Sequence, residues 1–177
     1  MEQFLLVHPS PTWGKAIMDY RQEFLDAGSS MDGSGSLRRC ETAEEFLERT
    51  ALFADPDTVP EGYVEATQFL WVRKSDGVLV GMIQVRHRLN EKLERWGGHI
   101  GYSIRPSERG KGYAVPMLAA VLPYCRHLGL EKVLVTCDAT NEPSRRIILA
   151  NGGVFDGTAV SDEDETVERY WITVPKK

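Results

Sequence analysis

The chain has 177 residues, of which 42% are hydrophobic and 27% are charged, and its formal net charge is −5 at pH 7. These values fit one soluble domain over residues 1–177 that closes its own core. The acidic balance argues against a general nucleic-acid or anionic-membrane surface, because either would need a basic face.

The first predicted element is a short strand at residues 4–7. The N-terminal segment has no basic n-region and only a short apolar run, so we expect neither a signal peptide nor a membrane span. A cytoplasmic location is the default expectation. Three widely spaced cysteines, Cys40, Cys125 and Cys137, suit reduced packing residues better than a disulfide frame or a metal site.

Apolar residues at helical spacing predict a helix over residues 13–25, with Thr12 as its N-cap. The following residues, 28–36, are too polar and too rich in glycine for regular structure. We expect a mobile loop there, either a connector or a lid over a substrate. Thr42 and Glu45 form a capping box, which predicts a second helix ending before Asp55.

The middle of the chain predicts a β-hairpin followed by a strand. Residues 66–73 and 78–86 are apolar and rich in β-branched or aromatic side chains, and Asp76-Gly77 between them is a hairpin signal. Residues 97–105 are expected to form the next strand. A helix follows residue 114, and Pro123 should kink or shorten it.

Residues 132–137 form a continuous apolar run, typical of a strand buried on both faces and parallel to the strand before the helix. A helix over 141–150, capped by Asn141, and two strands at 154–160 and 167–174 complete the chain. The acidic residues 161–165 are expected at a solvated hairpin tip. The fold class is therefore α/β, with a mixed, mostly antiparallel sheet and flanking helices.

Residues 105–114, with the sequence Arg-Pro-Ser-Glu-Arg-Gly-Lys-Gly-Tyr-Ala, lie between a predicted strand and a predicted helix. Glycines allow successive backbone N–H groups to converge on one oxyanion, and the start of a helix adds unpaired donors and a partial positive charge. Three cations, Arg105, Arg109 and Lys111, add longer-range attraction. The segment predicts a loop that binds a pyrophosphate.

The loop and the order of elements resemble the GNAT superfamily of acyl-CoA-dependent N-acetyltransferases, over nearly the whole chain. The family's loop pattern is matched by Arg109, Gly112 and Ala114, and Gly110, Lys111 and Tyr113 fill its variable positions. The resemblance implies acetyl-CoA as cosubstrate, its diphosphate held by these amides, and no metal. It also implies a strand pair that splays apart, leaving a slot for the pantetheine arm.

The resemblance assigns further residues to this slot. Ile104 would offer its backbone N–H to the thioester carbonyl, and Asp138 would line the slot. Asn141 and Ser144 match the family's second cofactor-contact region, although both are equally ordinary helix-start residues. Shorter phrases, such as Met31-Asp32-Gly33-Ser34-Gly35, look like a branch of bacterial acetyltransferases of undefined substrate.

A protonated primary amine needs a base, and His99, on the strand leading to the loop, is the first candidate. Strand alternation makes His99 point correctly only if a bulge shifts the register. The alternative is a structural or hydrogen-bonding histidine. Arg86, His87 and Asn90, at the end of the preceding strand, are candidates for binding an acceptor that bears a carboxylate or phosphate; the alternative is a charged strand end that faces water. Asp138 is a further candidate for acceptor binding.

Many members of the superfamily carry a tyrosine that protonates the leaving thiolate, and Ile148 stands at that position here. A thiol pKa of about 8.5 lets the thiolate leave without full protonation. Water, or the hydroxyl of Tyr102, Tyr113 or Tyr170, is an alternative donor. An acyl-cysteine at Cys137 is disfavoured, because no histidine is placed beside it.

Two other classes compete with the transferase. A non-catalytic CoA-sensing module would explain the missing tyrosine and the uncertain base. A dinucleotide-binding oxidoreductase shares the strand, Gly-x-Gly, helix and strand, but the third glycine of that fingerprint is absent. The acceptor amine, whether a small molecule or a peptide, is undefined by the sequence, and a homodimer is left open.

Overall fold

The computed structural model describes residues 1–176; Lys177, the last residue of the expected domain, lies outside the described part. The strands form a four-stranded sheet in the order β1-β2-β3-β4 and a three-stranded sheet in the order β5-β7-β6. All pairings within both sheets are antiparallel. The strands are β1 Phe4–Val7, β2 Ala66–Arg73, β3 Leu79–Arg86, β4 Ile100–Ile104, β5 Lys132–Asp138, β6 Val154–Val160 and β7 Thr166–Thr173.

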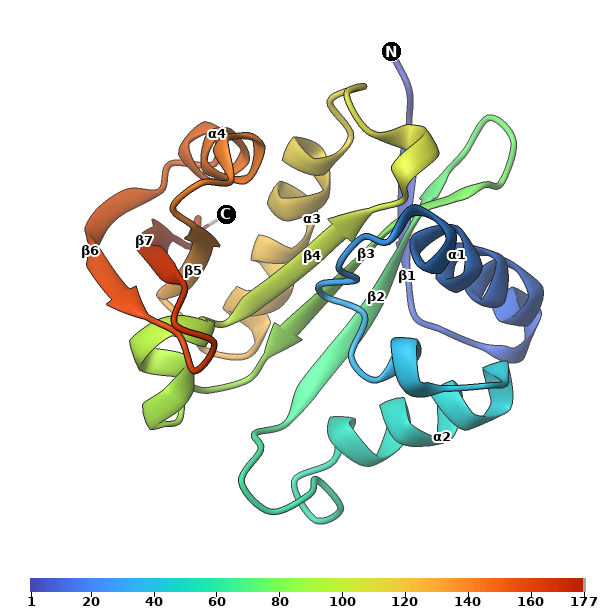
Figure 1. The fold of residues 1–177 in the computed structure, drawn as a ribbon, viewed down its shortest axis with the longest axis horizontal. Helices are drawn as coiled ribbons and strands as arrows, with labels where there is room; N and C mark the ends of the chain where they lie inside the picture. The colour runs from blue at the N-terminus through green and yellow to red at the C-terminus, as the bar shows by residue number, and fades with distance from the viewer. Residues whose placement is uncertain (177) are drawn as a thin grey trace.

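Helices cover both faces of the first sheet (Figure 1). The helices are α1 Gly14–Ala27, α2 Ala43–Ala54, α3 Ala114–His127 and α4 Glu142–Ala150. Helices α1 and α2 pack on one face, while α3 packs on the other face and also contacts α4. The loop between α1 and α2 crosses over β3 and β4, so this loop and the start of α3 lie on opposite sides of β4.

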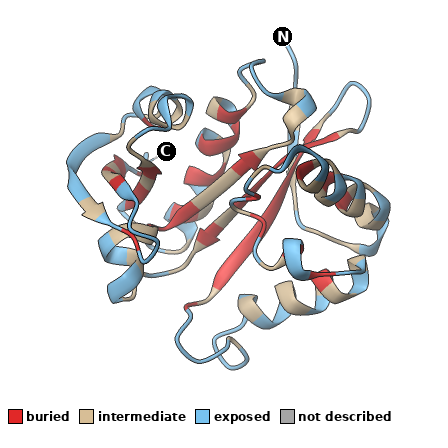
Figure 2. Ribbon diagram, in the orientation of Figure 1, coloured by how far each residue is buried: buried red, intermediate tan, exposed pale blue. Residues whose placement is uncertain are grey.

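Strand alternation divides the buried side chains into two cores. Phe69 and Trp71 of β2 belong to the core beneath α3, whereas Leu70 and Val72 belong to the core beneath α1 and α2. The central strands are therefore buried on both faces, as Figure 2 shows. This explains why their sequences read as continuous apolar runs rather than as an alternation.

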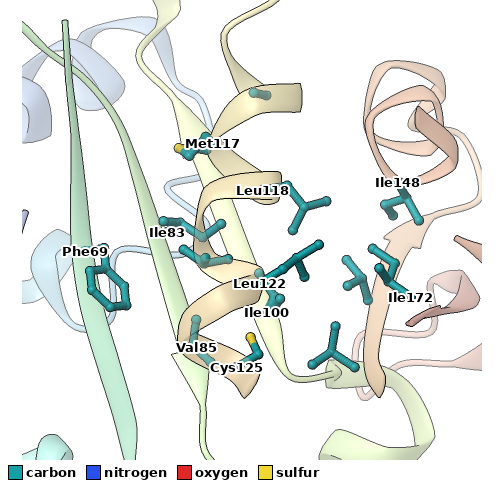
Figure 3. Packing of buried hydrophobic residues seen from close by; sticks show 14 of the residues in the cluster. Phe69, Ile83, Val85, Ile100, Met117, Leu118, Leu122, Cys125, Ile148 and Ile172 are labelled. Carbon is teal, nitrogen blue, oxygen red and sulfur yellow. The ribbon is translucent and has the colours of Figure 1, made fainter. Parts of the chain in front are cut away.

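Helix α3 joins the two sheets. Leu118 and Leu122 of α3 lie between Ile100 of β4 and Ile172 of β7, and Ile148 of α4 completes this cluster (Figure 3). Each fully buried aliphatic side chain contributes about 1.5–3 kcal/mol through removal of apolar surface from water. The packing fixes β5 beside β4 even though no continuous ladder joins the two sheets.

Most predicted elements are present, with three corrections. Thr12 lies in a 3₁₀ turn and does not cap α1, whose N-cap is Trp13. Residues 97–99 are not strand, because a π-helical turn at Leu93–Gly97 precedes β4. Helix α3 continues past Pro123 to His127, so the proline does not end it.

Other local predictions are confirmed. The Thr42 side chain accepts a hydrogen bond from Glu45 N at 3.1 Å and caps α2. Asn141 caps α4 in the same way, accepting from Ser144 N at 3.1 Å. Within residues 1–176, no helix is both long enough and apolar enough to span a bilayer.

Candidate active site

Strands β4 and β5 are held together at one end only. His99 N donates to Leu134 O at 2.7 Å, and Leu134 N donates to His99 Nδ1 at 2.9 Å. Gly98 makes this approach possible, since its φ is +74° and a Cβ there would lie 2.8 Å from Leu134 O. Beyond this contact β5 pairs with β7 alone, so a slot opens between β4 and β5.

Unpaired backbone groups line both sides of this slot. His99 O and Arg105 N are both bonded to β3, so in an antiparallel ladder the odd residues of β4 face β3. The N–H groups of Tyr102 and Ile104 therefore point away from β3, toward the slot. Since Leu134 N and O face β4, the same alternation turns the peptide groups of Thr136 and Asp138 toward the slot from the opposite side.

The loop between β4 and α3 presents free amides. Gly110 and Gly112 have φ of +77° and +81°, values that favour glycine, and nothing lies within 4 Å of a Cβ at either position. Among residues 1–176, no acceptor is recorded for the backbone N–H of Gly110, Lys111, Gly112 or Tyr113. Ala114 begins α3, so its N–H has no partner within the helix either. These groups are free to bind an anion, and we keep them as the candidate anion cradle.

The three loop cations are bound within the protein. Arg105 donates to Glu23 at 3.2 Å and to Leu79 O at 3.0 Å. Arg109 donates to Ile104 O at 3.0 Å and to Ser29 Oγ at 2.9 Å, and it lies over the Phe24 ring. Arg109 thus links the end of β4 to the α1–α2 loop, and the cradle consists chiefly of backbone.

Sequence reasoning missed an acidic residue within this loop. Glu108 is largely buried and lies 2.6 Å from Arg73 Nη1 and 2.8 Å from Lys111 Nζ. Arg73 comes from β2, contacts Asp76 at 2.7 Å, and lies over the Tyr113 ring, so it supports the loop from the hairpin. The hydrogen bond from Arg73 lowers the pKa of Glu108. No sequence motif connects these distant positions.

Tyr102 reaches across the slot from β4 to α4. Its phenol oxygen lies 2.7 Å from Ser144 Oγ. Burial raises the pKa of Tyr102 to about 12. Asn141 serves as the α4 cap, and Ile148 is fully buried in the core beneath α3. Tyr102, rather than position 148, therefore places a hydroxyl at the slot.

His99, the predicted base, lies at the closed end of the slot. Its side chain is only 4% exposed, and its Nδ1 accepts the Leu134 N–H. Burial, together with the charge of Arg86, lowers the pKa of His99 to about 4. The ring is neutral near pH 7 and its Nδ1 lone pair is occupied. This geometry assigns His99 to the clamp between β4 and β5, so the expectation of a catalytic base is corrected.

The predicted acceptor residues on β3 are not brought together. Arg86 donates from Nη1 to Gly97 O at 3.1 Å and Gly98 O at 3.0 Å, on the face below the α1–α2 loop. His87 lies on the opposite face, 2.7 Å from Thr67 Oγ1, and Asn90 caps the turn at Leu93. Arg86 alone remains near the slot.

The glycine-rich loop is anchored rather than free. Gly33 packs directly on β4, since a Cβ there would lie 2.3 Å from Gly101 O. Gln68 Nε2 donates to Gly33 O at 2.7 Å, and Ser34 Oγ donates to Met31 O at 2.5 Å. Met31 and Ser34 are buried. The loop forms a fixed wall over the face of β4 opposite α3.

Carboxylates from three elements border the mouth of the slot. The hydrogen bond with Asp138 raises the pKa of Glu165, and the charges of Asp138 and Asp32 contribute to the same rise. Thr140 N and Thr140 Oγ1 donate to Asp138, at 2.9 and 2.7 Å. Asp32 also adds to the high pKa of Tyr102, after burial. Asp138 was predicted from the sequence; Asp32 and Glu165 were not assigned a role.

Cys137 lies at the end of β5 and is 6% exposed. Burial raises the pKa of Cys137 to about 11, so it is a thiol rather than a nucleophilic thiolate near pH 7. Cys40 and Cys125 are also free and buried. Within residues 1–176, no three His, Cys, Asp or Glu side chains gather closely enough to hold a metal ion.

Comparisons with known proteins agree with this architecture. The acetyltransferase (GNAT) domain family matches residues 23–154. A ribosomal-protein-S5-alanine acetyltransferase from Vibrio fischeri has 16% identity over 99% of this chain and 96% of its own, with a TM-score of 0.74. A ribosomal L7/L12 alpha-N-protein acetyltransferase in complex with coenzyme A has 16% identity over 97% and 94%, with a TM-score of 0.69.

A third structure is a chimera of Vibrio cholerae spermidine N-acetyltransferase, with 18% identity over 97% of this chain and 95% of its own and a TM-score of 0.66. No curated protein matches the chain. The family match spans more than half of the sequence, so the chain belongs to the GNAT acetyltransferase family. It is an acyltransferase that uses acetyl-CoA, and its fold is the one that the sequence predicted.

Proposed function

We propose that this protein transfers an acetyl group from acetyl-CoA directly to a primary amine of a small molecule or peptide. One observation carries the proposal: the free amides from Gly110 to Ala114 stand at the end of β4, where β4 and β5 are separated. Backbone donors at a helix N-terminus suit a diphosphate. An amine as the acceptor is consistent with the solved relatives, which acetylate protein N-termini or spermidine.

The slot suits an extended thioester carrier. The pantetheine arm carries two amide groups, and free strand edges can pair with such groups as with an extra strand. The N–H groups of Tyr102 and Ile104 face this space from one side, and the peptide groups of Thr136 and Asp138 face it from the other. We assign the N–H of Ile104 to the thioester carbonyl, where it would stabilise the developing oxyanion.

The chemical step forms a C–N bond between the amine and the acetyl carbon and breaks the C–S bond. Tyr102 is the donor that we assign to the departing sulfur. Its pKa of about 12 lies above that of a thiol, about 8.5, so a hydrogen bond to the thiolate is favoured over complete proton transfer. Ser144 Oγ then supports the phenol oxygen, as it does in the structure.

The amine must lose a proton, and His99 is not available for this step. The mouth carboxylates are the alternative proton acceptors. Glu165 is the better acceptor of its pair, because the hydrogen bond with Asp138 raises its pKa and the hydrogen bonds from Thr140 lower the pKa of Asp138. We propose that the ammonium enters past these carboxylates and transfers its proton to them through water.

A CoA-sensing module is the second candidate, because His99 offers no free base and position 148 carries no tyrosine. The two functions are separated by calorimetry with acetyl-CoA followed by a thioester-loss assay over a panel of amines. Binding with turnover supports the transferase, and binding without turnover for every amine supports the sensor. Absence of binding at millimolar acetyl-CoA would contradict both.

A further inference from the structure

The α1–α2 loop covers polar side chains on the sheet. Arg86 and Gln84 are alternate residues of β3 and face the loop. Gln84 Nε2 would lie 3.2 Å from a Cβ at Gly35, and Arg86 Nη2 would lie 3.5 Å from a Cβ at Gly101. A fully apolar face would seal the loop onto the sheet. These polar groups instead form part of the floor beside the slot.

Arg86 is a half-buried cation whose charge has no close partner. Its Nη1 binds the carbonyls of Gly97 and Gly98, which are neutral groups. Among residues 1–176, no carboxylate oxygen lies within 4.0 Å of its guanidinium, and no acceptor is recorded for its Nε or Nη2. A guanidinium removed from water without a counter-charge is costly, and a carboxylate bound at its free edge would offset that cost.

The carboxylate whose charge acts on Arg86 is Asp32. Burial lowers the pKa of Arg86, and Asp32 is the charge that opposes this shift. Asp32 follows Met31 and precedes Gly33, so it lies on the wall above the same floor. Its charge also contributes to the raised pKa of Tyr102 and of Glu165. A ligand in this position would have a cation on one side and carboxylates on the other.

From this arrangement we infer that the acceptor is a zwitterion of the α-amino-acid class, with its carboxylate on Arg86 and its ammonium at Asp32, on the face of β4 that the α1–α2 loop covers. The inference rests on the proposed function and narrows its acceptor. An α-amino acid carries its ammonium and its carboxylate on the same carbon, which suits a floor that offers the cation Arg86 beneath a wall that carries Asp32. A polyamine would leave Arg86 without an anion, and so would the N-terminus of a long peptide.

The test compares L-α-amino acids with their matching α-carboxamides, together with spermidine, as acceptors of acetyl-CoA. The carboxamide keeps the amine and the side chain but removes the negative charge. Loss of one charged hydrogen-bonded pair with the substrate should lower kcat/KM by about 10- to 100-fold. The wild type should therefore prefer the best amino acid to its carboxamide by about 10-fold or more.

The variant Arg86→Met should lower kcat/KM for the amino acid by about 10- to 100-fold and leave the carboxamide within about 3-fold. The ratio of the two substrates does not depend on the fraction of folded enzyme, so partial unfolding cannot imitate the result. Arg86→Lys should retain part of the preference. Arg88→Met is the matched control, because Arg88 is exposed and pairs with Glu65 away from the slot.

Three outcomes would overturn the inference. In the first, the wild type uses the carboxamide or spermidine as well as the amino acid. In the second, Arg86→Met lowers kcat/KM equally for the amino acid and the carboxamide. In the third, no panel member is acetylated. If no panel member is acetylated, the proposed acetyl transfer fails as well. Calorimetry then shows whether the protein still binds acetyl-CoA. The first two leave acetyl transfer intact and remove only the zwitterionic acceptor.

Discussion

The phenol oxygen of Tyr102 lies 2.7 Å from Ser144 Oγ, so a hydroxyl from β4 meets the first turn of α4 across the open slot. This contact places a hydroxyl at the slot, whereas Ile148 is buried in the core. It also means that the two sides of the slot are joined by side chains at the level where their backbones have separated.

The variant Tyr102→Phe should lower kcat by about 10- to 100-fold while the KM for acetyl-CoA changes little, because the hydrogen bond forms mainly to the developing thiolate. Steady-state rates of thioester loss measure both constants. Tyr63→Phe is the control, since Tyr63 is exposed in the segment between α2 and β2. An equal kcat for Tyr102→Phe and the wild type would exclude Tyr102 as the donor.

The variant Gly112→Ala should weaken acetyl-CoA binding by about 5-fold or more. The φ of +81° leaves room for a Cβ but strains an L residue by about 1–2 kcal/mol, and relaxation of that strain would turn the amides away from their common focus. Gly62→Ala is the control, because its φ of +86° gives the same strain on a remote loop. Titration calorimetry should show weaker binding for Gly112→Ala only; equal affinities for the two variants would contradict the cradle.

The variant Glu108→Gln should strengthen acetyl-CoA binding by about 3-fold. It removes a negative charge close to the proposed diphosphate and releases Lys111, and a unit charge about 7 Å away in water is worth about 0.6 kcal/mol. The same variant should lower Tm, because Arg73 loses a largely buried partner. Glu48→Gln, at an exposed position of α2, is the control for the loss of one negative charge. Weaker binding by Glu108→Gln would show that the carboxylate orders the loop instead.

The variant Gly33→Ala should abolish acceptor turnover while acetyl-CoA binding is retained. Its Cβ would lie 2.3 Å from Gly101 O, so the loop must lift from β4 and the wall of the acceptor side is lost. Gly28→Ala is the matched control in the same loop, with φ of +62° and nothing within 4 Å of the Cβ. Turnover by Gly33→Ala at the level of Gly28→Ala would show that the wall has no role.

His99 predicts a loss of stability at low pH. Its folded pKa of about 4 lies below the usual 6.5, so the unfolded chain binds the extra proton as pH falls through this interval. Stability from His99 is fully present above about pH 6.5, falls between pH 6.5 and 4, and amounts to about 3 kcal/mol for a shift of about 2.5 units.

Urea unfolding of the wild type and of His99→Asn from pH 7 to 4 measures this contribution. The asparagine Oδ1 can still accept the Leu134 N–H but does not titrate, so the stability difference between the two proteins should shrink as pH falls. A difference that stays constant over this range would mean that His99 is protonated in the folded protein.

The sequence determined the elements whose signals are local. Asp76-Gly77 specified the β2–β3 hairpin, Thr42 with Glu45 specified the start of α2, and Asn141 specified the start of α4. Gly110 and Gly112 likewise indicated a tight turn before α3, because a positive φ is a property of single residues. Such features depend on a few neighbouring residues, which a sequence displays directly.

Only the tertiary structure decided what each side chain of the site does. His99 turned from a predicted base into a clamp because Leu134, 35 positions later, occupies its Nδ1. Arg86 was separated from His87 because adjacent strand residues face opposite sides of the sheet. Glu108 and Arg73 met only through folding, since 35 positions separate them in the chain. Burial and charge pairing act between distant residues, so no local pattern encodes them.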